Sequence, residues 1–259
     1  MEKTLIEGQS DREFVSSFAK GLSVICAFGR ETPDMTLSEV AQKTGMTRAA
    51  ARRFLLTLEA LGYACADGKR FSLTPKVLEL GFSYLSSMDV WDVAMPFMEQ
   101  VTEEIRESCS ASVLEGNDVV YVARVPTKRI MSVSLHLGAR LPAFATSMGR
   151  VLLAALSDED ARAIIQGSNR TRFTQATVTG LDDLMEIVRT TRTQGYALVN
   201  QELEEGLCSV AVPLVNSSGR VLAALNVSGH SSRTTPAEMI ESYLPALLRA
   251  QEGIAKAIV

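Results

Sequence analysis

Two patterns of hydrophobic and polar residues follow each other along the chain. Up to about residue 108, apolar residues recur every three or four positions, the spacing of helices with one buried face. From Ser110 onward, short runs alternate apolar and polar residues as half-buried β-strands do, with further helical stretches between them. The chain is therefore expected to have an α/β (α+β) fold with a helical first part.

The first predicted helix runs from about Arg12 to Phe28. Its apolar stripe is expected to cover the helices that follow it. The members of this stripe are Phe14, Phe18, Leu22, Ile25 and Phe28.

The segment 36–61 predicts two short helices joined by a tight turn. Thr36 and Glu39 have the spacing of a capping box, which starts the first of these helices, and Thr47 is an N-cap for the second. Gly45, between the two helices, can adopt the left-handed backbone conformation that such a turn requires. The segment therefore predicts a helix-turn-helix.

The second of these helices has two different faces. Its buried face is predicted from apolar residues at helical spacing, namely Ala51, Phe54, Leu55, Leu58 and Leu61. Its outer face carries Ala49, Arg52 and Arg53, with Arg48 and Ala50 beside them. Small side chains let a helix approach base edges, and arginine offers a planar fork of donors to guanine or to phosphate. This face suits the major groove of DNA, and a solvated basic helix is the alternative.

Two short extended runs follow this helix directly. Residues 63–66 and 71–73 flank an Asp-Gly turn, which predicts a β-hairpin. Lys69 and Arg70 at its tip are expected to meet phosphates, so the whole segment predicts a winged helix-turn-helix. The candidate DNA-binding residues are Thr36, Thr47, Arg48, Ala49, Ala50, Arg52, Arg53, Lys69 and Arg70.

The segment after the hairpin predicts a linker helix over residues 75–88. Thr74 and Pro75 have the pattern of an N-cap followed by proline at the first helical position. The linker is more apolar than a lone surface helix needs to be, which predicts packing against a second subunit. A longer amphipathic helix, from Trp91 to Ser108, is expected to begin the second domain. Its predicted buried residues are Val93, Phe97, Met98, Val101 and Ile105.

The second domain is predicted to combine a sheet with several helices. Strands are expected at 111–114, 119–123, 130–135, 196–199, 208–215 and 221–228. A loop over 138–150 leads into a helix, and further helices are expected after Ser157, Gly180 and Thr235. The predicted domain limits are 1–74 for the DNA-binding domain, 75–88 for the linker helix and 89–259 for the second domain.

Composition and charge limit the kind of partner. With 259 residues, of which 46% are hydrophobic, the chain can form two domains with buried cores. The formal net charge is −4, and the excess of acidic residues lies after residue 76. An acidic chain is not suited to coating nucleic acid without specificity, so the recognition helix is expected to act as one of a pair in a dimer.

Several classes of protein are not expected. The four cysteines, Cys26, Cys65, Cys109 and Cys208, contain no C-x-x-C pair, so each is interpreted as a small buried hydrophobic residue. No signal segment and no long apolar run is visible, so a cytoplasmic protein without a membrane partner is expected. Since no nucleophile with an assembled base, no metal-ligand set and no phosphate loop is visible, no catalytic residue, metal or cofactor is expected.

Longer motifs resemble the IclR family of bacterial transcriptional regulators over essentially the full chain. They are T-L-S-E-V-A-Q-K-T-G-M-T from Thr36, L-T-P-K-V-L-E-L-G from Leu73, G-A-R-L-P-A-F-A-T-S-M-G-R from Gly138, Q-G-Y-A-L-V-N-Q-E-L-E-E-G from Gln194, and V-A-V-P-L from Val210 with G-R-V-L-A-A-L-N-V-S-G after it. Two further stretches resemble the branch that regulates aromatic-acid catabolism through the β-ketoadipate pathway. They are D-R-E-F-V-S-S-F-A-K-G-L-S-V-I from Asp11 and T-R-A-A-A-R-R-F-L-L-T-L-E-A-L-G-Y from Thr47.

The resemblance implies a domain organisation and a function. It implies a winged helix-turn-helix that binds double-stranded operator DNA, a GAF-like effector-binding domain, and assembly as homodimers or dimers of dimers. RNA polymerase is a further partner to consider. The implied effector is a small carboxylate of the protocatechuate pathway, such as protocatechuate, 4-hydroxybenzoate or β-ketoadipate. An enzyme of aromatic-acid metabolism that is tethered to DNA is the alternative function.

The effector is expected at the start of a helix in the second domain. Residues 146–149 open that helix, and its unpaired N–H groups and its dipole favour an anion. The resemblance implies that polar groups on two neighbouring strands complete the site, whereas hydrogen bonds to nearby backbone are the alternative for each hydroxyl. The candidate effector-binding residues are Thr146, Ser147, Met148, Val199, Ser209, Asn226 and Ser228. Val199 and Ser209 stand where some members of the family carry an acidic residue and a cysteine, which disfavours a very short ketoacid.

The remaining charged groups of the second domain have less defined roles. Glu202, Glu204 and Glu205 are interpreted as solvated charges on a loop. Arg140 and Arg150 are expected to pair with either an effector carboxylate or these glutamates. His136 and His230 are expected either at the rim of the pocket or as ordinary surface or core histidines.

Overall fold

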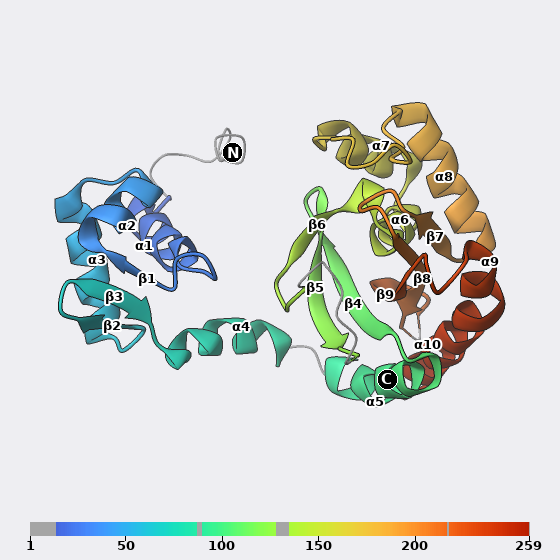
Figure 1. Ribbon diagram of the computed structural model, residues 1–259, viewed down its shortest axis with the longest axis horizontal. Helices are drawn as coiled ribbons and strands as arrows, with labels where there is room; N and C mark the ends of the chain where they lie inside the picture. The colour runs from blue at the N-terminus through green and yellow to red at the C-terminus, as the bar shows by residue number, and fades with distance from the viewer. Residues whose placement is uncertain (1–13, 87–89, 128–134, 217, 259) are drawn as a thin grey trace. The chain divides into compact units, whose positions relative to one another are not determined.

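The computed structural model describes residues 14–86, 90–127, 135–216 and 218–258 (Figure 1). The chain divides into two compact units, Met1–Ser87 and Met88–Val259. Each unit has its own cluster of buried hydrophobic residues. The first unit contains the helix-turn-helix and the second a curved sheet with helices, so the predicted α/β (α+β) class is confirmed.

Three helices and a small sheet form the first unit as far as Leu73, and the linker completes it. The elements before the linker are α1 (Ser16–Ala27), β1 (Asp34–Thr36), α2 (Leu37–Thr44), α3 (Arg48–Ala60), β2 (Ala64–Asp67) and β3 (Arg70–Leu73). The predicted hairpin is β2–β3, and β1 adds a third antiparallel strand beside β3 that was not predicted. Val24, Val40, Leu55 and Phe71 meet in the core, so all three helices and the sheet contribute to it.

Helix α1 is less buried than its stripe predicts. Phe18 is 68% exposed and Leu22 is 43% exposed, so the prediction that they cover the helix-turn-helix is wrong. Val24 and Ala27 are the buried residues of this helix, because only its C-terminal end reaches the core of the unit. Arg12, where the helix was predicted to start, lies outside the described residues.

Helix α3 has the buried face that its spacing predicts, except at the end. Ala51, Leu55 and Leu58 are buried, and Phe54 packs against the same core. Leu61 is 54% exposed, which contradicts the prediction. Leu61 is the C-cap residue and keeps helical backbone angles, so its exposure shows that the core of the unit does not extend to this end of the helical face.

The linker begins with a 3-10 turn, Pro75–Val77, that continues into helix α4 (Leu78–Leu85). The proline at the start is as predicted, but Thr74 does not cap the turn with its side chain. Its hydroxyl instead donates to the carbonyl oxygen of Gly62 at 2.5 Å, which fastens the end of the hairpin to the end of α3. Helix α4 leaves large apolar side chains exposed, including Leu78 at 74% and Phe82 at 67%.

A six-stranded antiparallel sheet forms the centre of the second unit, in the order β6-β5-β4-β9-β8-β7. The strands are β4 (Ser108–Glu115), β5 (Asp118–Val125), β6 (Arg140–Pro142), β7 (Ala197–Asn200), β8 (Leu207–Val215) and β9 (Val221–His230). Five of the predicted strands are confirmed, and most of the one predicted at 130–135 lies outside the described residues. Strand β6 formed within a segment that was predicted as a loop, because it pairs with the edge of β5.

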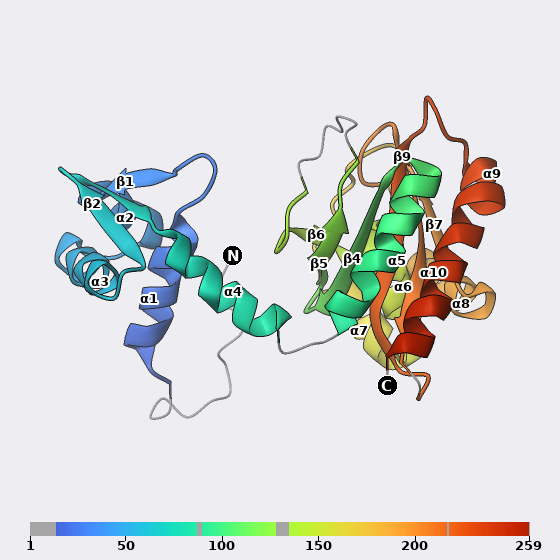
Figure 2. The ribbon, with the colours of Figure 1, turned by 90° about the horizontal axis from the view of Figure 1, so that it is seen from below.

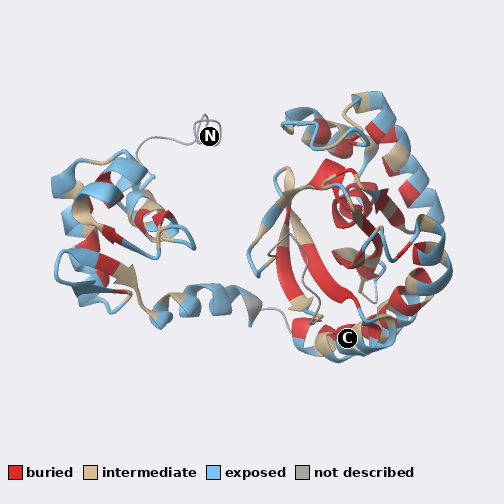
Figure 3. Ribbon diagram, in the orientation of Figure 1, coloured by how far each residue is buried: buried red, intermediate tan, exposed pale blue. Residues whose placement is uncertain are grey.

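Helices cover both faces of this sheet (Figures 1 and 2). They are α5 (Val90–Ile105), α6 (Ser147–Ala154), α7 (Asp158–Gly167), α8 (Leu181–Gln194), α9 (Pro236–Glu238) and α10 (Leu244–Ala257). α5 and α10 lie together on one face, with Met98 and Val101 buried as predicted and Val93, Phe97 and Ile105 only half-buried. α6 packs on the other face, with α8 beyond it. Buried residues gather on the sheet and on α6, which is buried along its whole length (Figure 3).

Helix α6 starts in close contact with the turn before it, the 3-10 turn Ala143–Ala145. Gly149, in the first turn of α6, lies so near the backbone of Ala143 that any β-carbon would overlap the Ala143 carbonyl oxygen. The hydroxyl of Thr146 accepts a hydrogen bond from the Gly149 N–H at 3.2 Å and caps the helix. These contacts fix where α6 begins above the sheet.

Candidate functional site

The helix-turn-helix has the local geometry that the sequence predicts. The N–H of Thr36 donates to the Glu39 carboxylate at 2.6 Å, and the N–H of Glu39 donates to the Thr36 hydroxyl at 3.4 Å. Hydrogen bonds from the backbone N–H and the side chain of Thr36 to the Glu39 carboxyl lower the pKa of Glu39, so the capping carboxylate is ionised at neutral pH. Gly45 has a φ of +66°, and the Thr47 hydroxyl accepts from the N–H of Ala50 at 3.2 Å. The capping box, the left-handed turn and the second N-cap are therefore confirmed.

The outer face of α3 is open and positively charged. Arg48, Ala49, Arg52 and Arg53 are exposed, and Ala50 is half-buried. Within the part of the chain that the structure describes, none of these three arginines forms an ion pair. Their guanidinium groups are therefore available to an external anion, and contact with DNA stays a prediction.

The two basic residues of the wing differ in their surroundings. Lys69 lies in the exposed two-residue turn between β2 and β3. Arg70 is the first residue of β3, where its guanidinium group pairs with Asp34 of β1 and lies 3.8 Å from Glu39. Arg70 thus fastens the wing to β1 and α2. A phosphate contact by Arg70 would compete with this ion pair, whereas Lys69 has no such constraint.

All seven candidate effector-binding residues line one cavity in the second unit. The lining comprises Tyr121, Arg124, Leu135, Leu141, Ala145, Thr146, Ser147, Met148, Val199, Leu203, Leu207, Ser209, Asn226 and Ser228. The free volume is about 30 Å³, which is room for about two water molecules. An aromatic acid would therefore need surrounding side chains to move. The role of these residues in binding an effector stays a prediction.

The polar strand residues that line this cavity, Ser209, Asn226 and Ser228, belong to a polar stripe on the sheet. Ser108 pairs with Ser228, and Ser228 pairs with Ser209, so these residues form one row across β4, β9 and β8. Ser110 and Asn226 form the next row, two residues along each strand and hence on the same face. The intervening residues, such as Cys109, point to the opposite face. The sheet therefore presents hydroxyl and amide groups to helix α6.

Hydrogen bonds join this stripe to α6. The Ser209 hydroxyl donates to the Ser147 hydroxyl at 2.9 Å, and the Asn226 amide donates to the Ser228 hydroxyl at 2.9 Å. The backbone N–H groups of Ser147 and Met148 have no partner among the described residues. A helix start with free N–H groups attracts an anion or another acceptor, as predicted from the sequence.

Arg124 is the charged pocket residue that sequence analysis missed. Its guanidinium group donates to the hydroxyls of Ser110 at 3.2 Å and Ser108 at 3.3 Å. Burial lowers the pKa of Arg124 and raises that of Tyr121 beside it to about 12, so the phenol is neutral and the guanidinium group keeps its charge at neutral pH. The signal available in the sequence was an arginine in an apolar strand opposite alternating serines.

A β-bulge explains why simple alternation could not place this arginine. Residues three apart on a strand normally point to opposite faces. The register between β4 and β5 shifts, so that Ala111 faces Ala123 but Ser112 faces Tyr121. The extra residue in β5 brings Tyr121 and Arg124 to the same side, which is how a bulge redirects a side chain.

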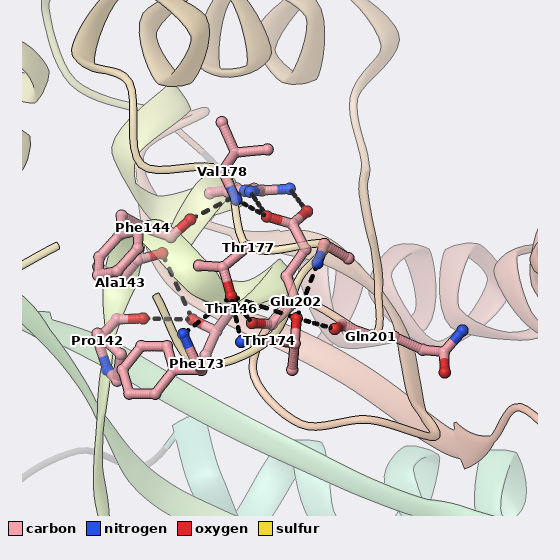
Figure 4. A network of polar contacts seen from close by, with 12 residues as sticks. Pro142, Ala143, Phe144, Thr146, Phe173, Thr174, Thr177, Val178, Gln201 and Glu202 are labelled. Atoms are coloured by element: carbon pink, nitrogen blue, oxygen red, sulfur yellow. Dashed lines mark hydrogen bonds and ion pairs between the residues drawn. The ribbon is translucent and has the colours of Figure 1, made fainter. Parts of the chain in front are cut away.

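A buried ion pair lies beside the pocket (Figure 4). Arg150 of α6 donates to both oxygens of Glu202, each at 2.7 Å, and to the carbonyl oxygen of Phe144 at 3.0 Å. Glu202 also accepts from the N–H of Val178 at 3.1 Å, and its carbonyl oxygen accepts from the Thr177 hydroxyl. Glu202 is only 8% exposed, so the prediction of a solvated charge is wrong. The pair fastens the loop between β7 and β8 to α6.

The other charged residues lie outside the pocket lining. Arg140 pairs with Glu115 at 2.7 Å and Asp118 at 3.2 Å on the surface, so the predicted alternative that it pairs with Glu202, Glu204 or Glu205 is wrong. Arg150 does pair with one of these glutamates, Glu202. His136 and His230 are exposed. Cys109 and Cys208 are buried as predicted, whereas Cys26 and Cys65 are exposed, which contradicts the interpretation given to them.

Two kinds of feature are absent from the part of the chain that the structure describes. No group of three or more histidine, cysteine or acidic residues there could hold a metal ion. No helix there is both long enough and apolar enough to cross a membrane.

A helix-turn-helix with a wing and an open basic helix, followed by a unit that encloses a polar pocket, defines a class of DNA-binding regulators with a ligand-binding domain. Comparison with protein families identifies the particular group. The IclR helix-turn-helix domain matches residues 17–68, and the C-terminal region of the bacterial transcriptional regulator IclR matches residues 82–256. The chain belongs to the IclR family of transcriptional regulators.

Individual relatives cover nearly the whole chain. The Pca regulon regulatory protein of Pseudomonas putida is 43% identical over 94% of this chain and 84% of its own length. The structure of a candidate transcriptional regulator from Rhodococcus sp. RHA1 is 45% identical, with a TM-score of 0.86 over 95% of this chain and 98% of its own. An IclR homologue from Microbacterium hydrocarbonoxydans, solved in complex with 4-hydroxybenzoate, is 25% identical, with a TM-score of 0.83 over 93% of this chain and 98% of its own.

Proposed function

We propose that this protein controls genes of aromatic-acid catabolism in response to a small carboxylate that binds in the second unit. The carboxylate is an aromatic acid, such as 4-hydroxybenzoate or protocatechuate, or β-ketoadipate. Its binding changes either the affinity for operator DNA or the activation of a promoter. The relatives named for the Pca regulon and solved with 4-hydroxybenzoate support this choice of effector.

The observation that carries the proposal is the make-up of the pocket. Hydrogen-bond donors converge in it from α6 and from three strands, and apolar side chains surround them, as expected for a site that binds a small polar molecule. Among the described lining residues, Tyr121 and Arg124 are the titratable groups, and no carboxylate lies beside them. Such a site suits an acid that is held and released unchanged.

The pocket gives little support to an enzyme. Among the described residues that line the pocket, the Ser147–Ser209 pair has no histidine, lysine or carboxylate to act as a base. The relatives are transcriptional regulators, so we infer that this protein has no enzymatic activity and needs no cofactor. A DNA-tethered enzyme of aromatic-acid metabolism would require turnover of the bound acid.

For the first unit we propose operator recognition through α3 and the wing. In this proposal residues 1–74 form the DNA-binding domain, 75–88 the linker and 89–259 the effector domain. The protein acts in the cytoplasm as a homodimer or a dimer of dimers, because one short helix in a net acidic chain reads too few bases for specificity. RNA polymerase is a further partner if the bound protein activates transcription.

The test selects genomic fragments with the purified full chain and measures their affinity with and without each acid. A preferred fragment whose Kd or mobility changes with one acid, while chromatography recovers that acid unchanged, is the expected result. If no fragment is preferred over bulk DNA at matched salt, the proposal is wrong. Conversion of the acid into a product would support the enzyme instead.

A further inference from the structure

Arginines of the second unit differ in their partners. Arg140 and Arg150 each pair with carboxylates of the chain at 2.7 Å. Arg124, which lines the pocket, is half-buried, and among the described residues its hydrogen-bond partners are the neutral hydroxyls of Ser108 and Ser110. It forms no ion pair within the described residues. The pocket therefore contains a partly desolvated positive charge whose counter-ion the described chain does not supply.

A second polar locus lies on the other side of the pocket. It consists of the start of α6 with the hydrogen-bonded hydroxyls of Ser147 and Ser209. Arg124 reaches over β4, where Ser108 and Ser110 lie, while Ser209 is on β8, two strands further in the sheet. Two strand spacings correspond to about 9 to 10 Å. This distance suits an aromatic ring or a short chain with a hydrogen-bonding group at each end.

The two loci differ in the group they favour. Arg124 carries a whole charge, and a guanidinium group binds a carboxylate through two charge-assisted hydrogen bonds. The start of α6 carries only a partial charge, and the two hydroxyls beside it can both donate and accept. A neutral hydroxyl or keto oxygen therefore fits the α6 locus, and the carboxylate fits Arg124.

We propose that Arg124 binds the effector carboxylate, and that the start of α6 with Ser147 and Ser209 binds an oxygen at the opposite end of the molecule. This assignment rests on the proposed function, because it names the polarity of an effector in the same pocket. It makes Arg124 the residue that separates acids from neutral molecules of the same shape. The bulge in β5 has a role here, because it turns Arg124 toward the pocket.

The test compares each acid with its carboxamide, or with the diamide in the case of the dicarboxylate β-ketoadipate, which keeps the shape and removes the charge. Titration calorimetry on the full chain would use 4-hydroxybenzoate, protocatechuate and β-ketoadipate, together with the amide of each acid that binds. We expect the wild type to prefer acid over amide, and Arg124→Gln to reduce that preference by about 10- to 100-fold, mainly through weaker acid binding. Arg140→Gln, a surface arginine outside the pocket, is the matched control and should leave the preference unchanged.

A second variant tests the orientation of the bound effector. Ser147→Ala should reduce the preference for 4-hydroxybenzoate over benzoate, which lacks the hydroxyl, and leave the preference for acid over amide unchanged. If Ser147→Ala changes the acid–amide preference and Arg124→Gln does not, the effector binds in the reverse direction and the assignment is wrong. The circular dichroism and melting temperature of each apo variant monitor folding. If Arg124→Gln does not fold, Arg124→Lys keeps the charge and should bind acids more weakly while still rejecting amides.

Failure of the proposed function can be distinguished from failure of the assignment of Arg124. If the wild type binds none of the three acids, the proposed function fails, and the assignment of Arg124 fails with it. If the wild type binds an acid but Arg124→Gln keeps the acid–amide preference, only the assignment of Arg124 is overturned.

Discussion

At the scale of single residues, Arg52 is the best test of the recognition helix. It is exposed at the centre of the outer face of α3 and forms no ion pair within the described residues. Arg52→Ala should weaken binding to the preferred operator by about 1 to 3 kcal/mol, because a lost pair of hydrogen bonds to a base edge costs that much. Fluorescence anisotropy at fixed salt would measure the change. An operator affinity equal to that of the wild type would remove Arg52 from base recognition.

Lys69 in the wing should behave differently from Arg52. A lysine in an exposed turn is suited to phosphate contact, which carries no sequence information. Lys69→Ala should therefore weaken cognate and random DNA alike and reduce the slope of log K against log salt by about 1. A loss confined to the cognate site would mean that the wing contacts bases. Arg70→Ala is not an equivalent test, because it also breaks the ion pair with Asp34 that holds the wing.

Ser147 tests the pocket separately from the DNA-binding unit. Its side chain is 1% exposed and hydrogen bonded to Ser209, so a leucine there fills the cavity and removes a polar partner. Ser147→Leu should abolish the response to the acid and leave DNA binding without the acid intact. A mobility-shift titration with and without acid would show both effects. A normal response to the acid would exclude the start of α6 from the effector site.

At the scale of elements, the ion pair of Arg150 and Glu202 connects α6 to the loop after β7. Leu203 lies in that loop and lines the pocket, so the pair positions one wall of the site. Glu202→Ala would leave a buried guanidinium group without its counter-ion. We expect a loss of about 3 to 5 kcal/mol in the free energy of unfolding, or roughly 6 to 20 °C in melting temperature.

Calorimetry of the full chain would measure this loss, with two comparisons. Glu202→Gln keeps the acceptor for the Val178 N–H and should lose less stability than Glu202→Ala. Asp182→Asn removes the carboxylate that pairs with Arg162 at the surface and should change stability by less than about 1 kcal/mol. Equal effects of Glu202→Ala and Asp182→Asn would show that the buried pair contributes no more than a surface pair.

Elements were predictable where their signals lie within a few residues. The capping box at Thr36, the left-handed Gly45 and the wing hairpin depend on neighbours in sequence, and each formed as predicted. In the stripe of α1, Ile25 and Phe28 pack against the core as predicted but Phe18 and Leu22 do not, because a helical pattern does not say how much of the helix another element covers. Strand β6 was not predicted for a related reason. Its three residues form a strand only because they pair with β5, and that pairing is not visible in the local sequence.

The pocket was predictable only in part. The seven candidate residues came from a family resemblance, and all of them line the cavity. Arg124 was missed because its direction depends on a bulge, and a bulge depends on pairing between two strands. The burial of Glu202 was missed for the same kind of reason, because its partner Arg150 lies 52 residues away in the sequence. Contacts between distant segments are set by topology rather than by local pattern.

At the scale of the whole molecule, the question is what covers two exposed apolar surfaces of the first unit, one on the α1 segment and one on α4. Phe14, Val15, Phe18 and Leu22 of the α1 segment are at least 40% exposed, and so are Leu78, Leu80, Phe82 and Tyr84 of α4. A soluble monomer rarely exposes so many large apolar side chains in two short helices. Covering them in a second subunit would also set the spacing between two recognition helices, which operator half-sites require.

Phe82 in α4 is the residue to test for this assembly, because it is 67% exposed and lies in the linker that was predicted to pack against a second subunit. Phe82→Glu places a charge that would be desolvated in an apolar interface, so the protein should dissociate toward monomers and bind its operator more weakly. Analytical ultracentrifugation over a range of concentrations would measure the dissociation, and a mobility shift would measure operator binding. Ser83→Glu adds the same charge at the next, already polar position and should leave both unchanged. If Phe82→Glu sediments as the wild type does and binds the operator equally well, α4 is not part of the subunit interface.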